Sequence, residues 1–153
     1  MTIAPIIKSV SVAVPPERAF ALFAGDIGRW WSPNMHIAPE PFTEIMIEPR
    51  AGGRWFERDA AGAECQWGKV LAWEPPGRLL LAWQLDASFT FDPDLITEVE
   101  VTFEPEATGS RVTLTHRNLE CFGPSTEKMV GRLAGGWPGL VERFATFIQE
   151  KAA

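Results

Sequence analysis

The sequence contains no tyrosine and only two cysteines and two histidines among its 153 residues. Cys65 and Cys121 are too few and too far apart for a metal-binding knuckle, and a domain of this length needs no disulfide to fold. No run of about 18 apolar residues occurs, so no membrane-spanning helix is expected. Residues 1–14 lack the basic start and long apolar run of a signal peptide. We therefore expect a soluble, cytoplasmic protein without membrane insertion.

Positive charge is also scarce, with 14 Lys and Arg against 20 Asp and Glu, for a net charge of −6. The basic residues are scattered, so the chain offers no patch for phosphate backbones and we expect no nucleic-acid partner. His36 lies in a Pro-rich segment and is expected at the surface. The histidines and cysteines show no metal-ligand spacing, so we expect neither a metal nor a cofactor.

Bulky apolar residues are abundant, because the chain carries seven Trp and ten Phe, and 46% of its residues are hydrophobic. Such side chains fill an ordinary core, and they also form the apolar walls that accept small hydrophobic ligands. Composition alone leaves both uses open.

Alternation and turn signals predict one strand, two short helices and six further strands. The strands are expected at 3–14, 42–48, 53–59, 63–74, 78–85, 97–104 and 110–118, and the helices at 16–24 and 26–31. The inward phase of 63–74 is ambiguous, and a β-bulge would resolve it. The sequence ERDAAGAE, residues 57–64, is typical of a solvated hairpin tip.

The C-terminal third predicts helices. Ser125 and Thr126 can cap a first segment, Gly135-Gly136 is expected to interrupt it, and Pro138 suits the first turn of a final helix of roughly 13 residues. Apolar residues from Trp137 to Ile148 recur at helical spacing. The order of elements predicts an α+β fold in one domain, residues 1–153, with a curved antiparallel sheet around the last helix.

Six segments resemble one protein superfamily, in the same order along the chain. They are VPPERAFALF (14–23), WW (30–31), PRAGGRWF (49–56), GKVLAWEPPGRLLLAW (68–83), GSRVTLTHRNLE (109–120) and GGWPGLVERFATF (135–147). Together they resemble the SRPBCC superfamily, also called START-like or Bet v-like, in the branch related to the C-terminal domain of the activator of the heat-shock protein 90 ATPase. The resemblance implies the helix-grip fold, with a ligand cavity between the sheet and the C-terminal helix.

His116 lies on the apolar phase of VTLTHRNLE (112–120), with Val112 and Leu114. Three interpretations remain: a core histidine with one hydrogen-bond partner, a cavity-wall residue that orients a ligand together with Asn118, and a general acid or base. The third lacks an orienting carboxylate, because Glu98 and Glu100 are expected to point to solvent.

The favoured function is the binding of a small apolar or aromatic molecule without catalysis. The expected ligand-binding residues lie at the end of the second short helix, on the strands and on the C-terminal helices: Trp31, Trp55, Trp83, Phe103, His116, Asn118, Met129, Leu133, Trp137, Leu140 and Phe144. We expect loops 32–41 and 86–96 to rim the cavity, because the irregular segments of this fold often do.

Two alternatives stay open. One is a cyclase, dehydratase or hydrolase that uses the same cavity, with His116 as acid or base. The other is a co-chaperone-like interaction module linked to stress response, which only the family resemblance suggests. A second copy of the chain is a further partner that the sequence leaves open.

Overall fold

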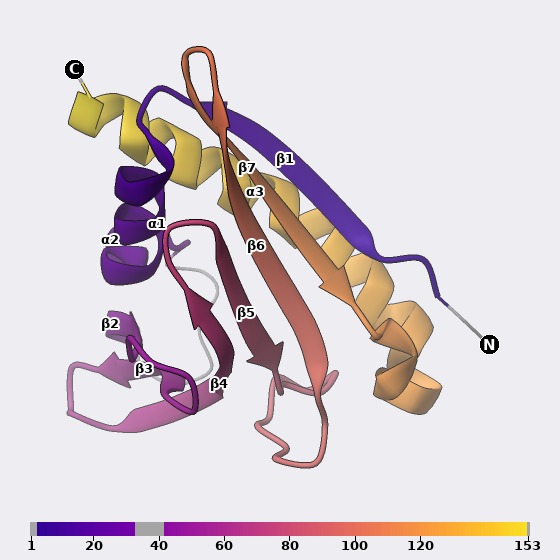
Figure 1. The fold of residues 1–153 in the computed structure, drawn as a ribbon. Coiled ribbons are helices and arrows are strands. Elements are labelled where there is room, and N and C mark those ends of the chain that lie inside the picture. The colour runs from indigo at the N-terminus through magenta and orange to yellow at the C-terminus, as the bar shows by residue number, and fades with distance from the viewer. Residues whose placement is uncertain (1–2, 33–41, 153) are drawn as a thin grey trace.

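The computed structural model describes residues 3–32 and 42–152, and the order of its elements is the predicted one (Figure 1). The elements are β1 (Ile6–Val12), α1 (Pro16–Gly25), α2 (Ile27–Trp30), β2 (Phe42–Ile47), β3 (Arg54–Asp59), β4 (Glu64–Glu74), β5 (Arg78–Trp83), β6 (Thr97–Glu106), β7 (Gly109–Arg117), the 3-10 helix η1 (Leu119–Ser125) and α3 (Thr126–Ala152). The predicted loop 32–41, with His36, lies outside the described residues apart from Ser32.

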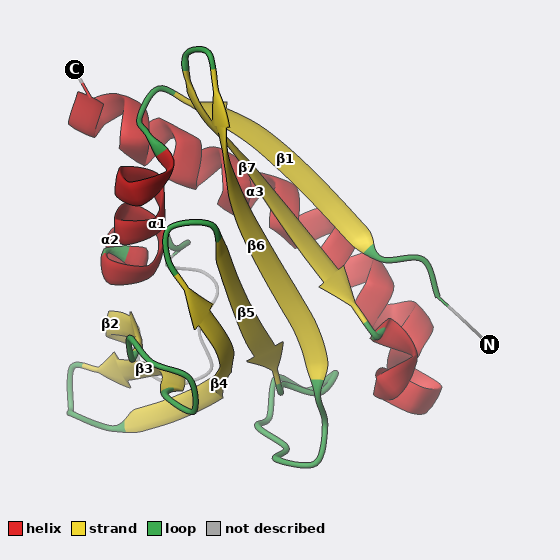
Figure 2. Ribbon diagram, viewed as in Figure 1, coloured by secondary structure: helices red, strands yellow, loops and turns green. Residues whose placement is uncertain are grey.

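All strand pairs are antiparallel, and they form one sheet in the order β1-β7-β6-β5-β4-β3-β2. The sheet curls, and α3 lies across its inner face (Figure 2). At one end of the sheet, α2 contacts both β2 and α3. This arrangement confirms the α+β helix-grip fold.

Alternation along β6 sets the inner and outer faces of the sheet. Val99, Val101 and Phe103 are buried, whereas the outward-facing glutamates form ion pairs with arginines. Arg117 Nε lies 2.9 Å from Glu98 Oε1, and Arg78 Nε lies 2.6 Å from Glu100 Oε2. The prediction that these glutamates leave the inner face is confirmed.

The predicted bulge in β4 is confirmed, and the strand has two. The pairing with β3 skips Trp67, and the pairing with β5 skips Leu71. Each extra residue resets which side chains face inward. Gly68 lies beside the first bulge, where a Cβ atom would overlap the carbonyl oxygen of Ala82, so only glycine fits there.

The predicted interruption of the C-terminal helix is wrong, because α3 continues without a break through Gly135-Gly136 and Pro138. A proline ring removes one hydrogen bond from a helix interior, and each glycine weakens the helix by about 1 kcal/mol. The apolar stripe nevertheless runs unbroken across this stretch, with Leu133 and Trp137 both buried, so packing on the sheet outweighs local propensity. Within the described ranges, no helix has the length and hydropathy that crossing a bilayer requires.

The hairpin tip between β3 and β4 also differs from its prediction. Glu57 and Asp59 are buried rather than solvated, with exposed fractions of 0% and 5%. Asp59 Oδ1 accepts hydrogen bonds from the backbone N–H groups of Ala61 and Ala63, at 2.9 and 3.0 Å. The carboxylate thus supplies the acceptors that the tight turn needs, which is why it turns inward.

Candidate functional site

Five buried tryptophans gather between the sheet and α3, and we call them the tryptophan cluster: Trp31, Trp55, Trp67, Trp83 and Trp137. Four of their indoles form a closed circuit in which each ring contacts two neighbours. The centroid distances are 5.5 Å from Trp31 to Trp67, 5.3 Å from Trp67 to Trp83, 5.7 Å from Trp83 to Trp137 and 6.1 Å from Trp137 to Trp31. The rings meet at interplanar angles between 65° and 87°, in edge-to-face geometry.

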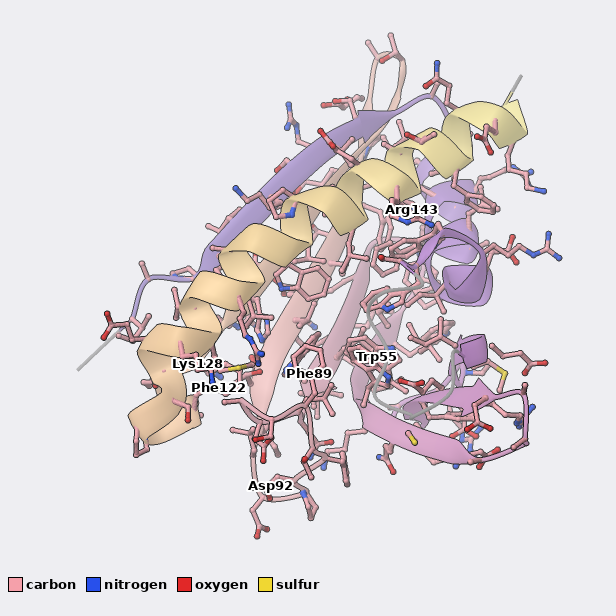
Figure 3. All side chains as sticks on the ribbon, turned by 180° about the vertical axis from the view of Figure 1, so that it is seen from behind. Trp55, Phe89, Asp92, Phe122, Lys128 and Arg143 are labelled. Atoms are coloured by element: carbon pink, nitrogen blue, oxygen red, sulfur yellow. The ribbon has the colours of Figure 1, made fainter. Side chains whose placement is uncertain are left out.

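Trp55 and Phe89 extend this circuit. The Trp55 ring stacks on Trp67 with centroids 5.7 Å apart, and it meets Trp31 and Trp83 edge-on. Phe89 comes from the loop between β5 and β6 and lies 6.1 Å from both Trp67 and Trp83. Figure 3 shows Trp55 and Phe89 on the side of the sheet that α3 covers. The site therefore draws its rings from strands, a helix and one loop.

His116 lies at the border of this cluster, fully buried on β7. Trp137 Nε1 donates a hydrogen bond to His116 Nδ1 at 3.0 Å, and His116 Nε2 lies 2.8 Å from Thr97 Oγ1. Thr97 Oγ1 in turn donates to the carbonyl oxygen of Trp83 at 3.0 Å. An indole N–H can only donate, so Nδ1 accepts and Nε2 carries the proton of the neutral ring.

Burial lowers the pKa of His116 to about 3. The charged imidazolium would have to be desolvated among indole rings, and its two bonding partners are neutral. At neutral pH the ring is therefore uncharged, with both nitrogens in hydrogen bonds. His116 thus has two side-chain partners, where the core-histidine interpretation expected one partner from backbone or water, and these hydrogen bonds include no carboxylate.

Glu57 brings a carboxylate to the other side of the cluster. It follows Trp55 by two residues on the inner face of β3, and its side chain is fully buried. Trp67 Nε1 donates to Glu57 Oε1 at 2.9 Å. The sequence did contain a signal, because Trp55 and Glu57 share one alternation phase in RWFERD. The polar composition of the hairpin, however, predicted that Glu57 is exposed to solvent.

Two arginines on α3 hold the parts of the site that lie outside the sheet. Arg143 Nε donates to the carbonyl oxygen of Trp30 at 2.9 Å. Trp30 is the last residue of α2, and the C-terminal end of a helix attracts a cation. Arg132 donates to the carbonyl oxygen of Ala87, and its guanidinium carbon lies 5.6 Å from the centre of the Phe89 ring. The first contact fixes the helix that leads to Trp31, and the second fixes the loop that carries Phe89.

The predicted site residues divide into three groups. Trp31, Trp55, Trp83, His116 and Trp137 come together in or beside the tryptophan cluster. Phe103 and Phe144 instead pack with the rings of α1 and α2, in what we call the phenylalanine cluster: Phe20, Phe23, Trp30, Phe103 and Phe144.

The remaining predicted residues belong to α3 or directly follow β7. Met129, Leu133 and Leu140 are buried on α3. The prediction that Asn118 continues the inward phase of the strand is wrong, because β7 ends at Arg117. Asn118 instead adopts a left-handed backbone, with φ 63°, where the chain turns into η1.

Among the surface grooves of the described residues are two that lie away from the tryptophan cluster. One of about 400 Å³ lies between α2 and α3 and includes Arg29 and Glu142. The other, of about 520 Å³, lies between α1 and strands β2 and β4 and includes Met46 and Trp73. In the described part of the chain, no group of three or more His, Cys, Asp or Glu side chains is placed to hold a metal ion.

The fold and its aromatic interior define a helix-grip protein of the SRPBCC class. The chain belongs to the family of activator of Hsp90 ATPase homolog 1-like proteins, whose model matches residues 13–149. No curated protein matches it significantly.

Solved structures resemble the chain over nearly its whole length. An anthrahydroquinone-γ-pyrone synthase, Txn09, is 35% identical, with a TM-score of 0.67 over 95% of this chain and 97% of that one. The self-sacrificing resistance protein CalC from Micromonospora echinospora is 27% identical, with a TM-score of 0.74 over 97% and 96%. Protein MLL2253 from Mesorhizobium loti, at 21% identity and a TM-score of 0.70 over 97% and 98%, shows the fold alone.

Proposed function

We propose that this protein binds a planar, multi-ring aromatic molecule at the tryptophan cluster. The observation that carries the proposal is the closed circuit of four indoles between the sheet and α3. Aromatic faces and edges offer large apolar contact areas and favourable ring–ring geometry, and most small-molecule sites are apolar with a few polar groups. Glu57 lies at one side of the circuit as such a polar group, and His116 at its border holds the Trp137 indole through a hydrogen bond.

The comparisons support the chemical class of the ligand. The name of the synthase relative describes a fused-ring product, an anthrahydroquinone joined to a γ-pyrone, and its identity to this chain is 35% along nearly the full length. A flat skeleton of that kind suits a site whose walls are indoles. We therefore take fused-ring quinones and hydroquinones as the first compounds to test.

Ligand entry requires movement, because the rings of the cluster contact one another. Phe89 is the ring best placed to move, since it is only partly buried and belongs to a loop. Its backbone has a φ of 55°, which non-glycine residues adopt at a cost, and Arg132 holds the loop in place. Displacement of Phe89 would open the face of Trp67 and Trp83.

A fluorescence titration with 2-methylanthraquinone tests the proposal, because a bound quinone next to the cluster quenches indole emission. We expect saturable quenching, and we expect Trp83→Phe to weaken binding at least severalfold. Trp73→Phe is the matched control, because Trp73 packs on Phe20 outside the cluster. Absence of saturable binding, or equal losses in both variants, would contradict the proposal.

A second candidate is an enzyme that closes a ring on such a molecule, which the synthase relative favours. His116 could take a proton at Nδ1 only after its bond with Trp137 opens, and could give its Nε2 proton to a ligand only after its bond with Thr97 opens. If His116 acts as acid or base, His116→Gln abolishes the ring closure of the substrate, while the variant still binds the quinone. Full turnover in that variant would exclude the role.

The co-chaperone alternative rests on the family description alone. On the outer face of the sheet, Arg–Glu pairs follow the strands, such as Arg58 with Glu44 and Arg78 with Glu100. Among the described residues, Ile7 is the large hydrophobic side chain with high exposure, at 55%. A pull-down with a heat-shock protein 90 homologue tests this candidate, and absence of stable binding would count against it.

A further inference from the structure

The indole N–H groups of the tryptophan cluster are not equally satisfied. Trp67, Trp83 and Trp137 each donate to an acceptor, namely Glu57 Oε1, the carbonyl oxygen of Leu85 and His116 Nδ1. Trp55 Nε1 has no hydrogen-bond partner, although the residue is only 1% exposed. An unpaired buried donor costs about 1–3 kcal/mol, so its presence calls for an explanation.

A carboxylate lies on the same strand face as this donor. Residues i and i+2 of a strand are separated by roughly 7 Å and point to the same side, which relates Trp55 to Glu57 on β3. Glu57 Oε1 accepts from Trp67, and the two oxygens of a carboxylate together offer about four lone-pair sites for donors. The inner face of β3 thus presents a donor and an acceptor side by side, both buried among aromatic rings.

We infer that the ligand carries a carbonyl oxygen that accepts from Trp55 Nε1 and a hydroxyl group that donates to Glu57. This inference rests on the proposed function, and it narrows the ligand class to hydroxylated quinones or hydroxylated aromatic ketones. The bound carbonyl oxygen gives the Trp55 N–H its missing acceptor. Part of the ligand's affinity therefore comes from removing the free-energy cost of an unpaired buried donor in the ligand-free protein.

An organic cation is the main competing ligand class, because a carboxylate among aromatic rings also suits an ammonium group. A quaternary ammonium has no acceptor, however, and would leave Trp55 Nε1 unpaired. The donor therefore favours a neutral ligand with an oxygen acceptor over a cation.

Three probes of similar shape separate the contributions: anthracene, 2-methylanthraquinone and 2-hydroxyanthraquinone. The first has no oxygen, the second has carbonyls, and the third adds a hydroxyl group in place of the methyl group. Affinities are measured by indole quenching at mildly acidic pH, so that the hydroxyl keeps its proton. We expect the wild-type protein to bind the hydroxyquinone most tightly and anthracene least tightly.

The variants assign each contribution to its residue. Trp55→Phe should lower the affinity for both quinones about five- to tenfold, the effect of one hydrogen bond, and leave anthracene unchanged. Glu57→Gln keeps an acceptor for Trp67 and should lower the affinity for the hydroxyquinone alone, by about tenfold. Trp30→Phe is the matched control, because it removes another buried N–H without a partner, in the phenylalanine cluster.

Several results would overturn the inference. They are equal wild-type affinities for the three probes, unchanged quinone binding in Trp55→Phe, and tighter binding of benzyltrimethylammonium than of either quinone. Failure of the proposed function has a different signature, since then none of the three ring compounds binds. Melting curves of each variant show whether a lost affinity reflects a lost fold.

Discussion

The two aromatic clusters pack on the inner face of the same sheet, and they differ in polarity. In the phenylalanine cluster, Phe23 contacts Trp30, Phe103 and Phe144 with centroids 4.8–5.8 Å apart. The tryptophan cluster contains indoles, with His116 and Glu57 as hydrogen-bond partners. Hydrocarbon rings need no partner, whereas each buried polar atom does.

We therefore expect the phenylalanine cluster to contribute mainly to stability and the tryptophan cluster to ligand binding. The phenylalanine cluster is a hydrophobic core that anchors α1 and α2. Its contribution to the free energy of unfolding follows from the apolar area that it buries. Each cluster contains one buried indole N–H without a partner, Trp30 Nε1 in the first and Trp55 Nε1 in the second, but Trp55 shares its strand face with the buried carboxylate of Glu57. Substitutions in the first should change the free energy of unfolding, and substitutions in the second should change binding.

Phe103→Ala tests the first half of this comparison and should have the largest effect. Removal of a buried phenylalanine costs about 3–5 kcal/mol, because the lost transfer free energy adds to that of the cavity left behind. We expect a loss of that size in urea unfolding, with the quinone affinity of the folded fraction unchanged. Phe103→Leu is the milder control. A fall in affinity as large as that of Trp83→Phe would remove the distinction between the clusters.

The pH dependence of stability tests the environment of His116. In the folded protein His116 resists protonation until pH approaches 3, whereas in the unfolded chain it takes up a proton near the ordinary histidine pKa of 6.5. Stability therefore declines as pH falls below 6.5, by about 1.4 kcal/mol per unit at most, which is about 2 kcal/mol at pH 5. His116→Gln should lose this slope between pH 7 and 5. The same slope in both proteins would contradict the assigned environment.

A matched pair of tryptophans tests the hydrogen bonds directly. Trp137→Phe leaves His116 Nδ1 without its donor and should cost about 1–3 kcal/mol beyond the loss of ring area. Trp30→Phe removes an indole of similar burial whose N–H has no partner, so it should cost less. Chemical denaturation of the two variants gives the difference. Equal losses would show that the bond to His116 contributes nothing.

Arg132→Ala should have the smallest effect on stability, below about 1 kcal/mol, because the side chain is exposed. It releases the loop that carries Phe89, so we expect faster association of 2-methylanthraquinone in stopped-flow fluorescence. Lys128→Ala, one helical turn earlier and also exposed, is the control and should leave the rate unchanged. An unchanged association rate in both variants would show that Arg132 does not control ligand entry.

The sequence predicted the fold well because its strands alternate clearly and its turns are marked by glycine and proline. Alternation also placed His116 on the inner face. The continuous α3 was missed, since local propensity at Gly135-Gly136 and Pro138 carries no information about the sheet beneath them. The boundary of β7 at Arg117 was missed by one residue, which removed Asn118 from the inner face.

The parts of the site that escaped prediction depend on tertiary structure. Trp67 became an inner residue through a bulge, and a strand pattern alone does not fix a bulge. Phe89 lies in a loop without periodicity. Glu57 had the right phase, but its burial depends on the donor that Trp67 provides from the neighbouring strand. The partners of His116, Trp137 and Thr97, likewise come from other elements.

The central claim is that the tryptophan cluster, and not the phenylalanine cluster, binds an aromatic ligand. The indole N–H resonances of the seven tryptophans report on both regions in one nitrogen–proton NMR spectrum. On addition of 2-methylanthraquinone, we expect the signals of the five tryptophan-cluster indoles to shift, Trp55 most of all, while those of Trp30 and Trp73 stay in place. Shifts at Trp30 and Trp73 alone, or no shifts at saturating probe, would contradict the account.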